Sequence, residues 1–158
     1  MAFAICDFKS CHKMAKFDFS GTKGLEKCLE AVNCSNFENF ECLVVDDNSS
    51  DDSVAVAKQF PVKVIELSEN NGPAHARNSG AKTSSAAVLI FIDSDVLIFP
   101  DTISKIVQAF QEYKDVAAII GSYDDQPHET SFISEFKNLL HHYVHQRSNE
   151  IVSTLQKT

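Results

Sequence analysis

The stretch Val88-Leu89-Ile90-Phe91-Ile92-Asp93-Ser94-Asp95 decides the fold that we expect for this chain. Its five consecutive apolar residues follow small residues and precede acids, which is typical of a strand buried on both faces in a parallel sheet. Ligands bind at the carboxyl ends of strands in open α/β sheets, so Asp93 and Asp95 lie where such a fold binds its ligands. Both carboxylates can reach one hard cation, and oxygen ligands suit Mg²⁺ or Mn²⁺. A strand end capped by two solvated acids is the alternative, because Asp-X-Asp is a short and common motif.

The composition indicates one domain and argues against nucleic-acid binding. The chain has 158 residues, of which 44% are hydrophobic, enough for one domain with a proper core. Its formal net charge is -8, and the basic residues are scattered singly. A nucleic-acid backbone therefore finds no basic patch on which to bind.

The cysteines and the apolar runs predict a cytoplasmic protein without a membrane anchor. The chain has five cysteines, an odd number, and no two of them form a Cys-x-x-Cys pair. Its first residues show no signal-peptide pattern, so we expect the thiols to be reduced. A zinc site at Cys6, Cys11 and His12 is not expected, because no second half-site is spaced to complete it. The longest apolar run, residues 86–99, is interrupted by two acids and is shorter than the roughly 20 residues that span a bilayer.

Strands and helices alternate around the opening stretch. Residues 1–23 keep no steady period, and we assign no element there. From Gly24 onward, hydrophobic spacing and turn residues predict the following order: a helix from Gly24 to between Asn33 and Asn36, a strand over Cys42 to Val45, a helix through Val54 to Phe60, a strand over Val62 to Leu67, a helix from Pro73, the strand over Val88 to Ile92, a helix from Pro100 through Phe110, a strand over Val116 to Ser122, and a helix over Thr130 to Gln146. This alternation predicts a layered α/β fold with a mostly parallel sheet.

Polar residues also follow the strand over Cys42 to Val45, in the run Asp46-Asp47-Asn48-Ser49-Ser50-Asp51-Asp52. Ser50, Asp51 or Asp52 can cap the helix that comes next. Further along, the turn Asn70-Asn71-Gly72-Pro73 places proline at the first helical position, and Arg77 lies one turn into that helix. The N–H groups of the first turn and the guanidinium both favour an anion there, although an ordinary solvated helix start is equally compatible with the pattern.

The last predicted helix carries histidines beside its apolar stripe. His141 and His145 share a face at a metal-compatible spacing. No helical Glu lies between them and no third ligand is apparent, so packing and hydrogen bonding are the preferred interpretation.

Three segments in a fixed order carry a resemblance to a known family: Val44 to Asp51, Asn70 to Asn78, and Phe91 to Asp95. Together they resemble the nucleotide-sugar-binding half of the family 2 glycosyltransferases, which have the GT-A fold, a three-layer α/β/α architecture. The resemblance extends over residues 24–146. It implies an irregular segment over 1–23, a donor-binding domain over 24–146 and a tail over 147–158.

The resemblance also implies roles for individual residues and a cofactor. Asp47 would face the nucleoside base with Asp46 beside it, and Arg77 would lie near the base or the diphosphate. Asp93 would hold the ribose or the shell of the metal, and Asp95 would bind a Mn²⁺ or Mg²⁺ ion that bridges the two phosphates of the donor. Asn71 and Gly72 complete the implied nucleotide-sugar-binding set. The donor would be a UDP- or GDP-sugar, and the acceptor a saccharide or a lipid-linked molecule at the cytoplasmic face of a membrane.

The family reaction inverts the anomeric centre by direct displacement, which requires a carboxylate to deprotonate the acceptor hydroxyl. In the family that base lies after the helix that contains Tyr143, and here no catalytic residue is assigned. The usual first strand is also not found before Gly24. We therefore expect a truncated or frame-shifted donor-binding core, and a non-catalytic remnant or interaction module is the main alternative. An aspartate-nucleophile phosphatase is a remote alternative. Such enzymes also carry Asp-x-Asp after a buried strand, but on their first strand, whereas here an earlier strand precedes it.

Overall fold

The structure is a computed structural model of the chain, and it describes residues 2–3, 22–94, 96–121 and 143. The chain divides into two compact units, residues 1–107 and residues 108–158. The first unit contains the three strands of the described sheet and all described candidate site residues.

The sheet is built around β2 (Leu43–Asp46), whose four residues are all buried. On one side it pairs in parallel with β3 (Lys63–Glu66), with Leu43 opposite Lys63 and Asp46 opposite Glu66. On the other side it pairs antiparallel with β1 (Ala2–Phe3). A central strand shielded on both faces is consistent with the run of apolar residues that predicts it.

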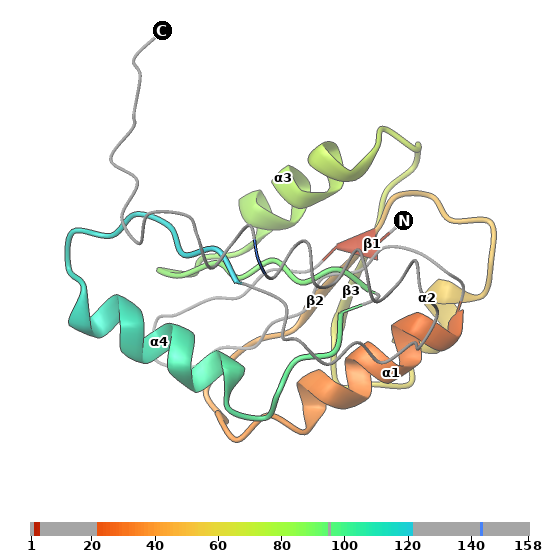
Figure 1. Cartoon of the computed structure of the whole chain (residues 1–158). Helices are drawn as coiled ribbons and strands as arrows, with labels where there is room; N and C mark the ends of the chain where they lie inside the picture. The colour runs from red at the N-terminus through yellow and green to blue at the C-terminus, as the bar shows by residue number, and fades with distance from the viewer. Residues whose placement is uncertain (1, 4–21, 95, 122–142, 144–158) are drawn as a thin grey trace, which may run out of the picture. The chain divides into compact units, whose positions relative to one another are not determined.

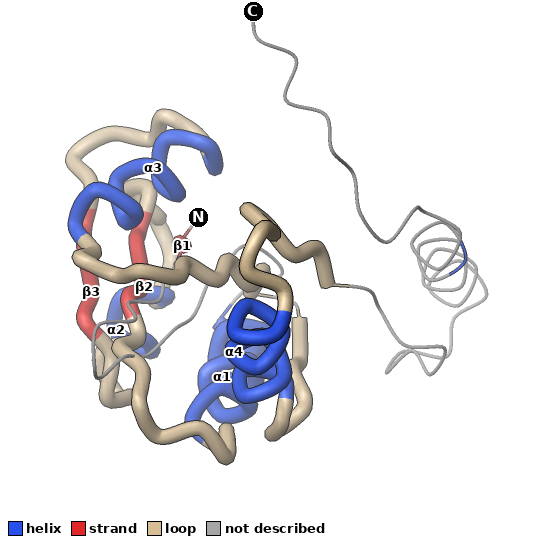
Figure 2. Tube along the Cα trace, turned by 90° about the vertical axis from the view of Figure 1, so that its left-hand side faces the viewer, coloured by secondary structure: helices blue, strands red, loops and turns tan. Residues whose placement is uncertain are grey.

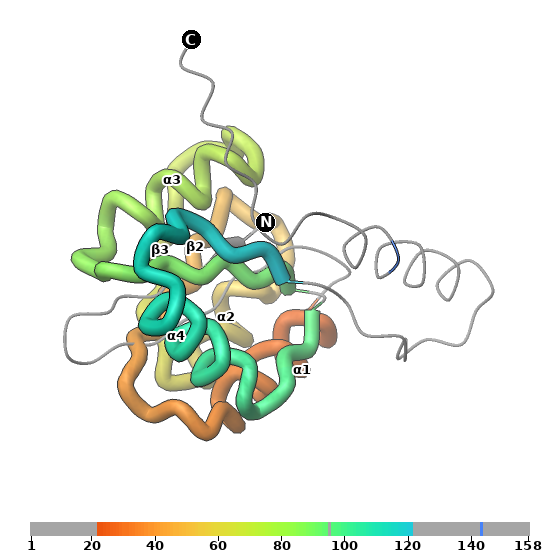
Figure 3. The backbone as a smooth tube through the Cα atoms, turned by 60° about the vertical axis from the view of Figure 1, so that its left-hand side comes forward, coloured from red at the N-terminus to blue at the C-terminus, as the bar shows by residue number. Residues whose placement is uncertain are grey.

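Helices cover both faces of this sheet. Figure 1 shows α3 (Pro73–Thr83) on one face, and α1 (Thr22–Asn33) and α2 (Ser53–Ala57) on the other, together with α4 (Thr102–Glu112). Figures 2 and 3 give the same order of layers from other directions. The unit is therefore a three-layer α/β/α arrangement, as the resemblance implies.

Side chains of β2 contribute to both hydrophobic cores, Leu43 and Val44 to the larger one and Val45 to the smaller one. Val44 faces the larger core, where it is buried with residues of α1 and with Ile103 of α4. Val45 faces the smaller core and is buried with Ala76 of α3. Val44 and Val45 lie in different cores because the pleat of a strand sends successive side chains to opposite faces.

The elements that lead up to the site agree with the sequence. The buried face of α1 consists of Leu25, Cys28, Leu29 and Val32, the spacing that predicts the helix. Asp52 is the N-cap residue of α2 but makes no capping hydrogen bond with its side chain; Asp51 Oδ1 accepts the N–H of Ser53 at 3.0 Å instead. The helix ends at Ala57 and not at Phe60, the predicted end. Pro73 begins α3 at the expected position, with Gly72 as its N-cap.

Two predicted strands are absent. No strand forms over Val88 to Ile92: Ile92 is buried, but Phe91 is 45% exposed. β2 is already flanked by β1 and β3, so it offers this segment no edge to pair with. No strand forms over residues 116–121 either, where Ile120 is 80% exposed, because no described strand pairs with them. The helix predicted over residues 130–146 lies outside the described residues, apart from Tyr143.

Candidate functional site

The carboxyl end of β2 carries a buried carboxylate with one unsatisfied oxygen. Asp46 is 4% exposed, and its Oδ2 accepts the backbone N–H of Ser49 at 3.0 Å. Asn48 lies within this turn at a φ of 59°, a left-handed conformation that asparagine tolerates better than most residues. Asp46 Oδ1 has no hydrogen-bond partner among the described residues. A buried oxygen of this kind is characteristic of a place that an ordered water or a ligand donor completes.

The neighbouring carboxylate, Asp47, binds the start of α3. Its side chain is fully buried, and its two oxygens accept the backbone N–H groups of Asn71 at 3.1 Å and of Gly72 at 2.7 Å. Gly72 has φ 84° and ψ 171°, a region of backbone conformation that essentially only glycine adopts. The glycine thus allows its N–H to point at Asp47 just before proline begins the helix.

These two hydrogen bonds attach the start of α3 to the end of β2. Only Ala76 and Gly80 of the helix are buried, and Ala76 packs against Val45. Burying one alanine methyl group contributes about 1 kcal/mol. Each hydrogen bond to a charged group contributes about 1.5–3 kcal/mol. The hydrogen bonds of Asp47 therefore contribute more to the position of α3 than the burial of Ala76 does.

An ion pair joins α3 to the segment that contains the Asp-Ser-Asp motif. Arg77 Nη2 and Asp93 Oδ1 lie 3.6 Å apart, and the two side chains are 38% and 46% exposed. A pair this open to solvent is worth about 0–1 kcal/mol. The ion pair by itself therefore adds little to the position of either side chain.

The motif itself contributes one further buried polar group. Ser94 is 3% exposed, and its Oγ has no hydrogen-bond partner among the described residues. Ser94 is not among the residues predicted from the sequence, because in Asp-Ser-Asp only the two flanking acids indicate ligand binding; a small hydroxyl between them is the available signal. The backbone carbonyl of Asp93 accepts a weak hydrogen bond from Sγ of Cys28 in α1, at 3.7 Å.

The described residues are compatible with a divalent ion, although they do not form a complete cage for one. Among residues 22–94 and 96–121 no three Asp, Glu, His or Cys side chains gather as a metal site. Magnesium commonly takes only one or two protein carboxylates together with phosphate oxygens. The half-exposed carboxylate of Asp93 suits that role. Asp95, His141, His145 and the cysteines and histidine near the amino terminus lie outside the described residues.

The structure thus links predicted residues from three parts of the sequence. Hydrogen bonds connect Asp47 with Asn71 and Gly72, and the ion pair connects Arg77 with Asp93. Asp46 lies beside Asp47, but its own described hydrogen bond goes to the Ser49 turn.

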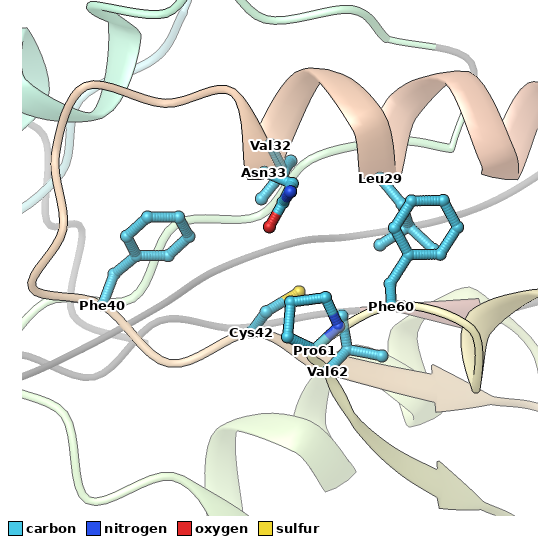
Figure 4. A pocket seen from close by; sticks show the side chains of 8 residues that line it. All are labelled: Leu29, Val32, Asn33, Phe40, Cys42, Phe60, Pro61 and Val62. Atoms are coloured by element: carbon cyan, nitrogen blue, oxygen red, sulfur yellow. The ribbon is translucent and has the colours of Figure 1, made fainter.

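The hollow drawn in Figure 4 has a different character and lies at the other end of the strands. It encloses about 240 Å³ of non-protein space, part of which is open solvent. Its lining comes from the end of α1 and from the residues that enter β2 and β3: Leu29, Val32, Asn33, Phe40, Cys42, Phe60, Pro61 and Val62. With a single polar side chain, Asn33, among these residues, it is a gap in the apolar core rather than a second polar site.

Comparison with known proteins supplies the family. A model of the family described as glycosyl transferase family 2 matches residues 21–154. An uncharacterized glycosyltransferase of Haemophilus influenzae is 36% identical over 85 residues, which cover 53% of this chain and 29% of the relative. A dolichol-phosphate mannosyltransferase of Pyrococcus furiosus is 35% identical over 109 residues, which cover 66% of this chain and 30% of the relative. The chain thus spans about a third of the length of these relatives.

A solved structure shares the fold. Residues 1–349 of Staphylococcus aureus TarS in complex with UDP match with a TM-score of 0.54 and 21% identity, over 70% of this chain and 38% of that one. At this identity the likeness establishes the fold, and it confirms the expected GT-A architecture. Among the described residues, no helix is long and apolar enough to cross a membrane.

Proposed function

The chain belongs to glycosyl transferase family 2, and on that premise we propose that the carboxyl end of β2 binds the nucleoside diphosphate of a nucleotide-sugar donor. The binding domain that we propose extends over residues 24–146. The reaction it serves is transfer of a glycosyl group, with inversion, to a hydroxyl of an acceptor. The relatives that support this proposal are longer proteins, and this chain matches only part of each. The proposal therefore concerns the donor-binding step first.

One observation carries the proposal: hydrogen bonds and an ion pair connect three polar segments that are far apart in the sequence. They meet through Asp47, through the turn at Asn71 and Gly72, and through the contact between Arg77 and Asp93. The arrangement offers what a nucleoside diphosphate needs. Asp46 Oδ1 can accept an N–H from the base, and the Arg77 guanidinium can bind phosphate oxygens in a bidentate manner.

We assign a divalent ion, Mn²⁺ or Mg²⁺, to Asp93 and Asp95. The chemistry that such an ion supplies is neutralisation of the charge that develops on the departing diphosphate. Arg77 contributes positive charge to the same region, where its side chain is partly open to solvent and to the donor. The protein groups therefore orient the nucleoside diphosphate of the donor.

The base that removes the proton from the acceptor hydroxyl is not among the residues assigned here. A UDP-sugar is our first choice of donor, supported by the UDP in the TarS complex, and a GDP-sugar is the second. For the acceptor we propose a saccharide or a lipid-linked molecule. The mannosyltransferase among the relatives, named for dolichol phosphate, supports the latter.

Calorimetric titration of the full chain with UDP, UDP-glucose and GDP-mannose tests the proposal. We expect binding of at least one donor with Mn²⁺ present and weaker binding after EDTA is added. Asp95→Ala should remove the metal dependence. The matched control is Asp101→Asn, which removes a carboxylate that pairs with Lys105 at 2.7 Å, away from the site. Absence of binding in a folded sample, or binding indifferent to both EDTA and Asp95→Ala, would overturn the proposal.

A further inference from the structure

We propose that Asp47 is a positioning residue that holds Arg77 in place through the first turn of α3. This inference rests on the proposed function, since it assigns a task to Asp47 within the donor site. The resemblance implies that Asp47 faces the base. In the structure both of its oxygens bind backbone N–H groups and the side chain is fully buried.

A series of hydrogen bonds runs from Asp47 through Gly72 to Ala76, the residue before Arg77. Asp47 Oδ2 accepts the N–H of Gly72 at 2.7 Å, and the carbonyl of Gly72 accepts the N–H of Ala76 at 3.2 Å. Ala76 is the residue before Arg77, and its side chain is buried against Val45. A shift of the Gly72 peptide therefore moves the backbone that carries the guanidinium.

The rest of α3 cannot readily replace this support. Apart from Ala76, Gly80 is buried but has no side chain, and Ala81 is partly buried against the larger core and adds only one methyl group. The ion pair between Arg77 and Asp93 is half-exposed and gives little resistance to movement. Asp46 provides the contrast: it carries the oxygen without a described partner, so it is the carboxylate of the pair that can meet the ligand.

A double-mutant cycle on UDP binding, measured by calorimetry with Mn²⁺, tests this role. We expect Asp47→Asn to weaken binding about tenfold, because the amide can accept one backbone N–H but not both. In an Arg77→Ala background the same change should alter the dissociation constant less than twofold, because Asp47 acts through Arg77. Asp101→Asn, which makes the same chemical change elsewhere, should leave UDP binding unaltered. A purely structural role would lower the melting temperature without this dependence on Arg77.

The outcomes separate this inference from the proposed function. If the wild-type chain binds none of UDP, UDP-glucose and GDP-mannose, the proposed function fails, and the positioning role fails with it; if it binds only GDP-mannose, the same cycle is measured with that donor. If the wild type binds but the effects of the two variants simply multiply, the positioning role alone is overturned. If the Asp47→Asn variant does not fold, the positioning role is tested by amide hydrogen exchange of the wild-type chain without ligand. Slow exchange of the Gly72 amide supports the role, and fast exchange overturns it.

Discussion

The two ends of β2 differ in the side chains that surround them: apolar at the amino end and charged at the carboxyl end. Its amino end emerges beside Phe40 and Cys42, both buried, and apolar side chains from α1 and from the start of β3 enclose it. Its carboxyl end stops at Asp46 and Asp47, two buried carboxylates that bind backbone N–H groups. The amino end gains stability from removing hydrocarbon from water, whereas the carboxyl end accepts the cost of buried charge to hold polar groups in fixed positions.

The difference predicts that stability and ligand binding divide between the two ends. Substitutions at the amino end should lower the free energy of unfolding and leave the ligand affinity of the folded chain unaltered. Those at the carboxyl end should change affinity more than stability, as is common for sites that retain unsatisfied buried groups.

The largest loss of stability should come from the amino end. Leu29→Ala truncates a side chain that is 1% exposed and lines the hollow there, so the cavity should grow rather than collapse. We expect a loss of about 3 kcal/mol in urea unfolding, with unaltered UDP affinity in the folded fraction. Leu97→Ala is the control, because Leu97 is 43% exposed and should lose less than about 1 kcal/mol. Equal losses for the two variants would remove the distinction between the ends.

A smaller loss should come from the backbone at the carboxyl end. Gly72→Ala puts a Cβ into open space, with no atom within 4 Å, so the cost is conformational and arises from φ 84° and ψ 171°. We expect about 1–3 kcal/mol of destabilisation together with weaker UDP binding, because the N–H that Asp47 accepts must move. Gly121→Ala is matched to it, since Gly121 also has open space around it but no positive φ. A fully tolerated Gly72→Ala would show that the turn is not held as described.

Asp46→Asn should separate the two properties most clearly. The variant removes a buried charge that has one oxygen without a described partner, while an amide oxygen can still accept the N–H of Ser49. We expect the free energy of unfolding to change by less than about 1 kcal/mol, or to rise, while UDP binding is lost. Chemical denaturation and calorimetry on the same sample measure both. A large loss of stability would instead make Asp46 a structural residue like those at the amino end.

The sequence predicts this division well where local signals suffice. The spacing of Leu25, Cys28, Leu29 and Val32 is enough for α1, and proline after Gly72 is enough to fix the start of α3. The prediction of a strand over Val88 to Ile92 is wrong, because an apolar run does not indicate which edge of a sheet is open. In the structure β2 already has a neighbouring strand on each side.

The site shows the same limit at the level of single side chains. Motif order places Asp46, Asp47, Asn71, Gly72, Arg77 and Asp93 in one region, which the contacts of Asp47 and Arg77 support. The order of the motifs does not predict which of the two aspartates binds the backbone of the next motif. In the structure Asp47 does so, while Asp46 has an oxygen without a described partner. Adjacent identical residues are indistinguishable in sequence, and the strand pleat sends them to different surroundings.

The smallest expected effect lies in the solvent-exposed loop that continues from the carboxyl end. Hydrogen bonds from the Ser53 hydroxyl and backbone N–H lower the pKa of Asp51 below its usual value. Because the folded-state pKa is the lower one, the stabilisation is present above about pH 4 and is lost as the pH falls through the folded pKa. Since Asp51 is exposed and screened by water, Asp51→Asn should cost only a few tenths of a kcal/mol at pH 7. Urea unfolding at pH 7 and pH 3 should show the difference from wild type shrinking at the lower pH. A difference that grew there instead would mean that the carboxylate does not stabilise the start of α2.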